Sequence, residues 1–328
     1  MLLASALPDA RPRLGRWPTT VNTGLGYVAV LSATMLWGYA NVVMRQVEGT
    51  VAPGVLMWLR YLIPLVVVAP VLVKVRGAGP WFYGAVGAGA VLGWATYAQA
   101  VALKTIPVDQ MAFVSALYVV FTPLAASVGA RRGPSWTLVA ATVLSLLGVA
   151  LLIGGLGGGI RPGTWLALAS AVALTVQILA LSRLAVRATP LEIAAAESLG
   201  AVVVLSGVLA LHAGSSLAAL SHALAWPRGV WAGVLYLALG GGLLAYVLQA
   251  WGQRHVSATA AALAFNTEAV WSALLAWLIL AETLSAWQMA GAALTVGTLS
   301  AAVLLGSPRA SPIPDSARPG DRLGAPHR

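Results

Sequence analysis

Residues 98–140 read AQAVALKTIPVDQMAFVSALYVVFTPLAASVGARRGPSWTLVA, and residues 248–290 read LQAWGQRHVSATAAALAFNTEAVWSALLAWLILAETLSAWQMA. The two stretches align without a gap at an offset of 150, which places Gln99 on Gln249 near one end. Self-similarity at a fixed offset indicates an internal repeat.

A second match lies upstream, at an offset of 137. Pro53 falls on Pro190, and Arg60 falls on Glu197. Ala-rich helices produce chance identities, so the repeat gains weight only if the apolar segments agree with it in number and position.

The composition indicates that the chain resides in a membrane. Of the 328 residues, 59% are hydrophobic and 9% are charged, whereas a soluble domain has roughly 25% charged residues. A bilayer core about 30 Å thick is crossed by a helix of about 20 apolar residues. We therefore predict an all-α integral membrane protein with ten transmembrane helices, near residues 24–46, 52–73, 82–103, 109–129, 136–154, 164–186, 190–212, 229–252, 257–280 and 286–306.

These predicted helices form two groups of five. We expect a cytoplasmic N-terminal segment at 1–23, the first five-helix repeat at 24–154 and a Gly-rich linker at 155–163. The second repeat follows at 164–306, and a disordered cytoplasmic tail at 307–328. Because five is odd, the second repeat enters the membrane inverted relative to the first. Inverted repeats are typical of secondary transporters.

The basic residues predict the orientation. Threading the spans places 14 of the 19 Lys and Arg residues on one side of the membrane, and only Arg45, Arg60, Lys104, Arg161 and Arg228 on the other. By the positive-inside rule, both termini lie in the cytoplasm and the protein belongs to the cytoplasmic membrane. This distribution accounts for the net charge of +10 without a nucleic-acid partner.

Glu268 is the first functional candidate, because a charged group inside hydrocarbon costs at least about 2.5 kcal/mol. It lies about ten residues into its helix and thus about 15 Å deep, and Tyr118 is its repeat mate. One hypothesis is that Glu268 carries a proton or pairs with a substrate ammonium group. The structural alternative is that it caps a packing network with Tyr or Asn.

Arg60 and Glu197 are repeat mates of opposite charge. Each follows a helix-starting proline by seven residues, which places the two about 10 Å deep from opposite faces. They are either gates that close the two mouths in alternation or structural charges. In the structural interpretation, which we favour, Arg60 snorkels toward the outer interface and Glu197 bonds to the backbone or to a neighbouring helix.

Several short motifs stand out in both halves. They are Leu36-Trp37-Gly38, Leu59-Arg60-Tyr61-Leu62, Leu117 to Pro123 and Arg131-Arg132 in the first half, and Ala245-Tyr246, Ser257 to Ala260, Glu268 and Leu280 to Leu284 in the second. With these motifs, about residues 25 to 306 resemble the drug/metabolite transporter superfamily, EamA type.

The resemblance implies ten helices, cytoplasmic termini and a central cavity lined mainly by helices 1, 3, 4, 6, 8 and 9, with helices 5 and 10 at the periphery. It also implies transport of amino acids, their derivatives, nucleobases, sugars or drugs, often outward and in some members coupled to protons. The chain departs from the family pattern at two places. Ala269 follows Glu268 where a proline is common, and Arg131-Arg132 stands where many members have Gly-Glu.

We therefore expect a secondary active transporter that exports small metabolites, with a central substrate site. The residues expected to line it are Trp37, Asn41, Trp94, Tyr97, Tyr118, Gln177, Tyr246, Asn266, Glu268 and Trp271. The alternatives are a lipid-linked substrate flippase or scramblase, an intramembrane enzyme, and a scaffold without transport activity. The sequence leaves the coupling ion and a homodimeric state open.

No metal, cofactor or catalytic group is expected. The chain has no cysteine, and its four histidines are scattered without the spacing of metal ligands. It also has no phosphate-binding loop of the Walker type, which argues against an ATP-driven pump. The expected partners are a small solute and membrane lipid.

Overall fold

The computed structural model describes residues 20–75, 79–129, 133, 136–152, 161–184, 187–212, 214, 218, 220–252, 255 and 258–306. Within these ranges the chain is helical and contains no strand. The N-terminal segment up to residue 19, the Gly-rich stretch 153–160, Arg131-Arg132 and the tail 307–328 lie outside the described residues.

Among its described residues, the first half contains seven helices. Proline stands at the first position of two of them, where its missing N–H group has no intrahelical partner to lose. A break at Val68 bends the chain by 72° between the second and third helices. In order, the helices are α1 (Thr20–Val47), α2 (Pro53–Val67), α3 (Ala69–Val75), α4 (Pro80–Ala102), α5 (Val108–Ser115), α6 (Tyr118–Gly129) and α7 (Trp136–Leu152).

The second half follows the same order. It contains α8 (Pro162–Leu184), α9 (Pro190–Leu211), the short 3-10 helix η1 (Ala223–Ala225), α11 (Arg228–Leu235), the π-helical segment η2 (Tyr236–Leu244), α12 (Ala245–Gly252), α13 (Ala258–Leu280) and α14 (Ala286–Gly306). α11, η2 and α12 form one continuous helical unit. Thr189 and Glu192 begin α9 with a reciprocal capping box.

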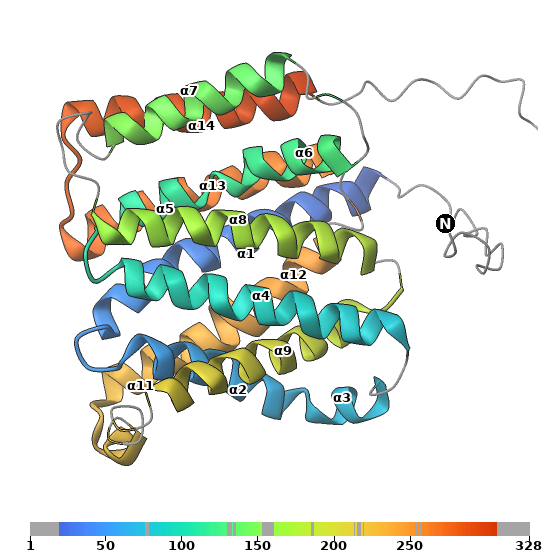
Figure 1. Ribbon diagram of the computed structural model, residues 1–328, viewed down its shortest axis with the longest axis vertical. Coiled ribbons are helices and arrows are strands. Elements are labelled where there is room, and N and C mark those ends of the chain that lie inside the picture. Colours follow the sequence, from blue (N-terminus) through green and yellow to red (C-terminus); the bar gives the residue numbers. More distant parts are fainter. Residues whose placement is uncertain are drawn as a thin grey trace, which may run out of the picture.

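The contacts between helices in one half are repeated between the equivalent helices of the other half. α8 corresponds to α1. α8 packs on α4, and α1 packs in the same way on the equivalent elements η2 and α12. Likewise, α8 packs on α5 and α6, and α1 packs on their equivalent α13. Elements that correspond to each other also pair directly, namely α2 with α9, α5 with α13 and α7 with α14. The pair of α7 and α14 forms one edge of the molecule (Figure 1), as the family resemblance implies.

Glycines bring the two halves together backbone to backbone. A Cβ atom on Gly200 of α9 would lie 1.8 Å from the carbonyl oxygen of Val86 on α4. A Cβ atom on Gly89 of α4 would lie 2.0 Å from the carbonyl oxygen of Glu197 on α9. Small residues at such crossings are typical of helix pairs in membranes, where close packing replaces the hydrophobic effect as the source of association.

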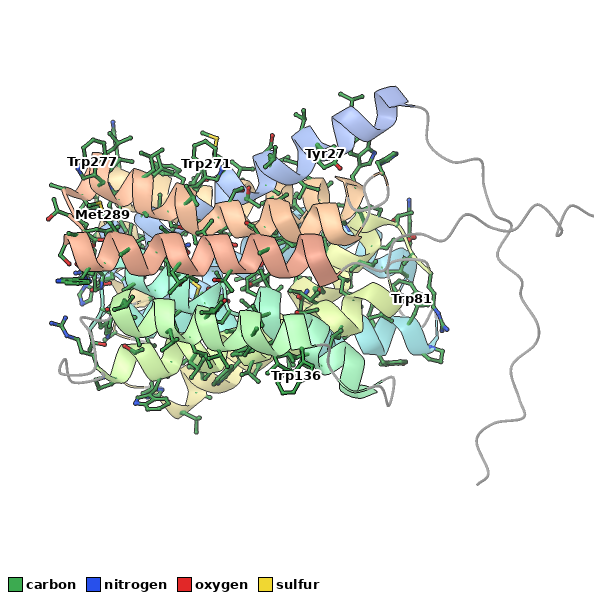
Figure 2. All side chains as sticks on the ribbon, turned by 90° about the horizontal axis from the view of Figure 1, so that it is seen from above. Tyr27, Trp81, Trp136, Trp271, Trp277 and Met289 are labelled. Atoms are coloured by element: carbon green, nitrogen blue, oxygen red, sulfur yellow. The ribbon has the colours of Figure 1, made fainter. Side chains whose placement is uncertain are left out.

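The outer surface is apolar. Tyr27, Trp136, Trp277 and Met289 project from it (Figure 2) and are 43%, 85%, 57% and 55% exposed. Among the described residues, four helices are long and apolar enough to cross a membrane, or five if the bent pair of α2 and α3 is one span. The molecule is therefore a multi-pass membrane protein, and the total of ten spans stays a prediction.

Candidate functional site

A cavity lies inside the bundle, between the two halves. Its volume is about 60 Å³. The lining comes from α1, α2, α4, α6, α8, α12 and α13, and consists of Trp37, Asn41, Arg60, Leu92, Thr96, Gln99, Tyr118, Leu174, Gln177, Ile178, Tyr246, Gln249, Phe265 and Glu268. Apart from Arg60 on α2, these helices are the ones that the family resemblance implies.

Glu268 lies in a polar cluster in this cavity. The Asn41 amide, the Tyr118 hydroxyl and the Arg60 guanidinium are its polar neighbours. The Asn41 amide also donates to Ser272 Oγ at 2.9 Å, one helical turn further along α13. The repeat mates Tyr118 and Glu268 are thus brought together in the cavity.

The close approach of α1 and α13 makes this cluster possible. Gly38 faces the backbone of Trp271, and a Cβ atom there would lie 2.6 Å from the Trp271 Cβ. A second polar contact joins the same two helices where Thr34 and Thr267 share a hydrogen bond of 2.9 Å between their hydroxyl oxygens. Asn41 can therefore reach across to α13.

The cavity lining itself is paired by the repeat. At the offset of 150, Gln99 corresponds to Gln249 and Thr96 to Tyr246. At the offset of 137, Trp37 corresponds to Leu174 and Asn41 to Ile178, and all four line the cavity. The two halves therefore contribute equivalent positions but different chemistry.

Three aromatic rings form an apolar wall of the cavity. The Trp37 ring lies 5.5 Å from that of Tyr246 and 6.2 Å from that of Phe265, between ring centroids. The indole nitrogen of Trp37 is buried and has no hydrogen-bond partner among the described residues. This wall suits an apolar group and leaves one donor for a polar one.

Arg60 and Glu197 both line a second, smaller pocket, and Arg60, Leu92 and Tyr246 are common to both pockets. Placement at two separate mouths is therefore wrong, because both side chains reach the same interior space. Snorkelling of Arg60 is also wrong, since the residue is only 4% exposed. Glu197 accepts a hydrogen bond of 2.7 Å from Gln177 Nε2 on α8, as the structural interpretation expects.

Six of the ten residues expected in the substrate site line the cavity, namely Trp37, Asn41, Tyr118, Gln177, Tyr246 and Glu268. Three do not. Trp94 is 39% exposed on the far side of α4, Tyr97 packs near Gly54 of α2, and Trp271 packs against Gly38. The backbone of Asn266 is helical, but its side chain lies outside the described residues.

Thr96, Leu174 and Ile178 were absent from the predicted lining. The repeat offset could have found them, because each is the mate of a predicted residue, respectively Tyr246, Trp37 and Asn41. Trp94 was wrongly included because depth along a helix does not reveal which face the side chain occupies.

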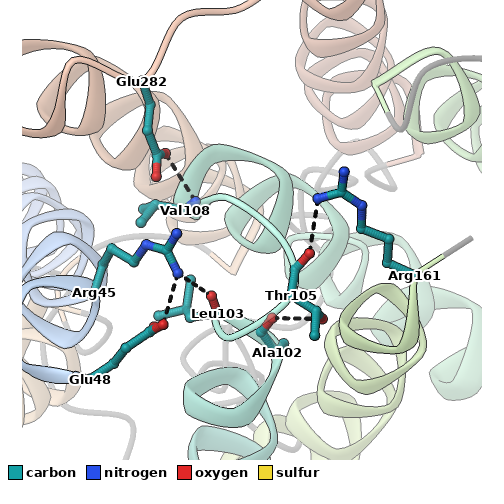
Figure 3. A network of polar contacts seen from close by, with 8 residues as sticks. All are labelled: Arg45, Glu48, Ala102, Leu103, Thr105, Val108, Arg161 and Glu282. Atoms are coloured by element: carbon teal, nitrogen blue, oxygen red, sulfur yellow. Dashed lines mark hydrogen bonds and ion pairs between the residues drawn. The ribbon is translucent and has the colours of Figure 1, made fainter.

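A polar network closes the face of the bundle at which α1, α4 and α13 end (Figure 3). We call it the Glu282 face. Arg45 forms an ion pair of 2.9 Å with Glu48 and also donates to the carbonyl of Leu103. On α8, Arg161 donates to the Thr105 carbonyl at 3.1 Å. The carboxylate of Glu282 accepts from the Val108 N–H group at 3.1 Å.

Glu282 ties the second half of the chain to the start of α5. Ala281 has a left-handed φ of 55°, which turns the chain sharply after α13. Partial burial and the nearby Asp109 carboxylate raise the pKa of Glu282, while the N–H group of Val108 and Arg45 act in the opposite direction. The group therefore sits among charges of both signs.

Large apolar side chains fill the bundle between this face and the cavity. Met44, Leu56, Leu103, Ile106 and Met111 are each less than 2% exposed. Each lies between a cavity residue of its own helical segment and the Glu282 face, or in the turn at that face. Packed side chains and the network above them thus lie between the cavity and the Glu282 face.

A polar cavity between two related halves of an apolar, multi-pass helical bundle is the architecture of a membrane transporter. The family profile of the EamA-like transporter family matches residues 24–154 and 161–304. The chain belongs to this family, and the family assignment made from its motifs is confirmed. It is a membrane transporter of the drug/metabolite type.

One solved structure, titled only as the crystal structure of a protein, is similar in fold, with a TM-score of 0.58. It is 23% identical in sequence, and the match covers 88% of this chain and 98% of that one. No curated protein matches this chain in sequence.

Proposed function

We propose that this protein is a secondary active transporter that exports small amphipathic metabolites, such as amino acids, by alternating access across the cytoplasmic membrane. The observation that carries the proposal is the cavity between the halves, in which Glu268 meets its repeat mate Tyr118. A site at the junction of two repeats is reached from either side when the halves exchange conformations.

The closed Glu282 face supports this mechanism. Alternating access requires that one face be sealed while the solute enters from the other. The distribution of the basic residues favours cytoplasmic termini, and the described chain starts and ends at the face opposite Glu282 (Figure 1). In this orientation the sealed face is the outer one, and the conformation is one in which an exporter has its external exit closed.

The cavity lining supports an amphipathic solute. The aromatic wall of Trp37, Tyr246 and Phe265 accommodates an apolar group, and the amides and the carboxyl group opposite it offer hydrogen bonds. Glu268 is the coupling residue in this proposal, because a buried carboxyl group can exchange a proton in one conformation and bind a substrate ammonium group in the other.

Flux measurements in proteoliposomes test the proposal. The purified protein is reconstituted and assayed with radiolabelled amino acids, nucleobases, sugars and cationic drugs under an imposed proton gradient. We expect gradient-driven flux of at least one solute, and its loss of pH dependence in Glu268→Gln. The absence of flux for every class contradicts the function, and unchanged pH dependence in Glu268→Gln contradicts the coupling role.

Glu192→Gln is the matched control for this experiment. It removes a carboxylate of the same chain at the start of α9, outside the cavity. Glutamine also serves at this capping position, so we expect flux and its pH dependence to be unchanged.

A further inference from the structure

Arg60 is a buried cation whose charge is poorly compensated. It is 4% exposed, and it donates to the Gly241 carbonyl from Nη2 at 3.2 Å. Its Nη1 contacts the sulfur of Met44 at 3.8 Å, a weak acceptor. Its Nε has no partner, and within the described ranges no carboxylate lies within 4.0 Å of the guanidinium.

Such an arrangement is costly unless something completes it. A charge removed from water is normally paired or surrounded by hydrogen bonds, and inside a membrane this requirement is stricter. Glu197 accepts a hydrogen bond from Gln177, and Glu268 acts on Arg60 only through longer-range attraction, since the two form no ion pair within 4.0 Å. The guanidinium is therefore left with free donor capacity at the point where the two pockets meet.

We propose that Arg60 is the receptor for a carboxylate group of the transported solute. Arginine binds carboxylates with two parallel hydrogen bonds, and its fork of donors is more specific than an ammonium group. The apolar part of the solute then lies against Trp37 and Phe265, in the cavity that Arg60 also lines. This inference rests on the proposed function and narrows it to organic acids and zwitterions with an apolar part.

The π-helical segment η2 holds Arg60 in place. Its Gly241 carbonyl accepts the one normal hydrogen bond of the guanidinium, and the Tyr236 hydroxyl donates to the Leu36 carbonyl on α1 at 2.7 Å. π-Helical turns are rare and frequently mark functional sites. Here the segment orients the cation toward the pockets while it leaves the Nε edge without a protein partner.

A pair of probes that differ only in the carboxylate tests the inference. They are 3-phenylpropionate and 3-phenylpropionamide, measured by the thermal stabilisation of the purified protein over a range of concentrations. We expect the acid to bind about tenfold to a hundredfold more tightly than the amide, which is the range of a hydrogen bond to a charged group. In Arg60→Gln this preference falls to about one, and Arg60→Lys retains part of it.

Arg228→Gln is the matched control. Arg228 is exposed at the start of α11, outside both pockets, so its removal lowers the net charge equally and leaves the preference for the acid unchanged. The inference is overturned if acid and amide do not differ in the wild-type protein, including the case that neither binds. It is also overturned if the preference survives in Arg60→Gln or, should that variant fail to fold, is undiminished in Arg60→Lys.

The outcome is separable from the proposed function. A preference for the acid that depends on Arg60, without gradient-driven flux of any solute, supports the carboxylate site and contradicts the transporter mechanism. Gradient-driven flux of a solute without any preference for the acid supports the transporter mechanism and contradicts the carboxylate site.

Discussion

Replacement of Gly200 by alanine is expected to force α4 and α9 apart. The new Cβ atom would lie 1.8 Å from the Val86 carbonyl oxygen, whereas contacts under 3.0 Å are essentially never seen. The two helices must therefore separate by at least 3.0 minus 1.8, or 1.2 Å, at this crossing. Because the opposing atom belongs to the backbone, no flexible side chain can move aside.

The cost of this separation can be estimated. Overpacking costs typically 1–3 kcal/mol, and a backbone-to-backbone clash belongs at the upper end, about 3 kcal/mol. Alanine regains up to about 1 kcal/mol through its higher helix propensity. The net loss of folding free energy is then about 2 kcal/mol, together with a displacement of the helix that bears Glu197.

Gly207→Ala on the same helix is the matched control, since nothing lies within 4 Å of a Cβ atom there. It is expected to be neutral or to stabilise by up to about 1 kcal/mol. The measurement is the heat resistance of detergent-purified protein, followed as the monodisperse fraction in size-exclusion chromatography after heating. Equal melting temperatures for Gly200→Ala and Gly207→Ala would refute the glycine-mediated contact between the halves.

Three further predictions concern the Glu282 face and the Glu268 cluster. The pKa of Glu282 is raised by partial burial and by Asp109, so the closed conformation binds more protons than an open one with an ordinary pKa. Its stability is therefore fully present below the ordinary value near 4.5 and is lost as pH rises through the raised value. Protection of the Val108 region, measured as hydrogen exchange relative to the intrinsic rate at each pH, should be higher at pH 4.5 than at pH 7, and a pH-independent protection would contradict this. Since the native chain has no cysteine, Val108→Cys with Glu282→Cys, joined by a short bifunctional maleimide, should block flux, whereas either single variant treated alike should not. Asn41→Leu leaves Ser272 without its 2.9 Å donor and should cost about 0.6–1.7 kcal/mol, the range of hydrogen bonds between membrane helices; an unchanged melting temperature would count against the bond.

The fold was predictable from the sequence because a bilayer imposes few choices. Continuous apolar segments of about 20 residues can only be helices there, since the backbone must satisfy its own hydrogen bonds. Pro53 and Pro190 begin helices within one residue of the predicted starts at 52 and 190, and Pro80 begins one two residues before the predicted start at 82. The breaks inside helices were less predictable. The bend at Val68 and the π-helical segment Tyr236–Leu244 depend on packing, although Pro64 and the glycines near Gly241 are a partial signal.

The sequence predicted how deep the site residues lie in the membrane better than it predicted which face of each helix they occupy. Hydrophobic pattern gives no helical phase when almost every residue of a span is apolar, and this is why Trp94 and Trp271 were expected in the cavity. Polar residues were better guides, because a membrane restricts them to the protein interior. Asn41, Gln177 and Glu268 all line the cavity. Arg60 forms no ion pair with a described carboxylate. Its correspondence to Glu197 in the repeat did not reveal this, because it depends on the geometry of the side chains.

The repeat imposes equal positions on the two halves, and the sequence then makes them chemically unequal. Tyr118 faces Glu268, Trp37 corresponds to Leu174, and Arg60 corresponds to Glu197. In the proposed mechanism, equal positions let the two halves exchange conformations. Unequal chemistry serves a different purpose, since a symmetric cavity would bind a polar solute equally well in two opposite orientations. The cavity holds one cation, Arg60, one carboxyl group, Glu268, and an aromatic wall. In the proposed mechanism this unequal lining gives a small amphipathic solute a single favoured orientation.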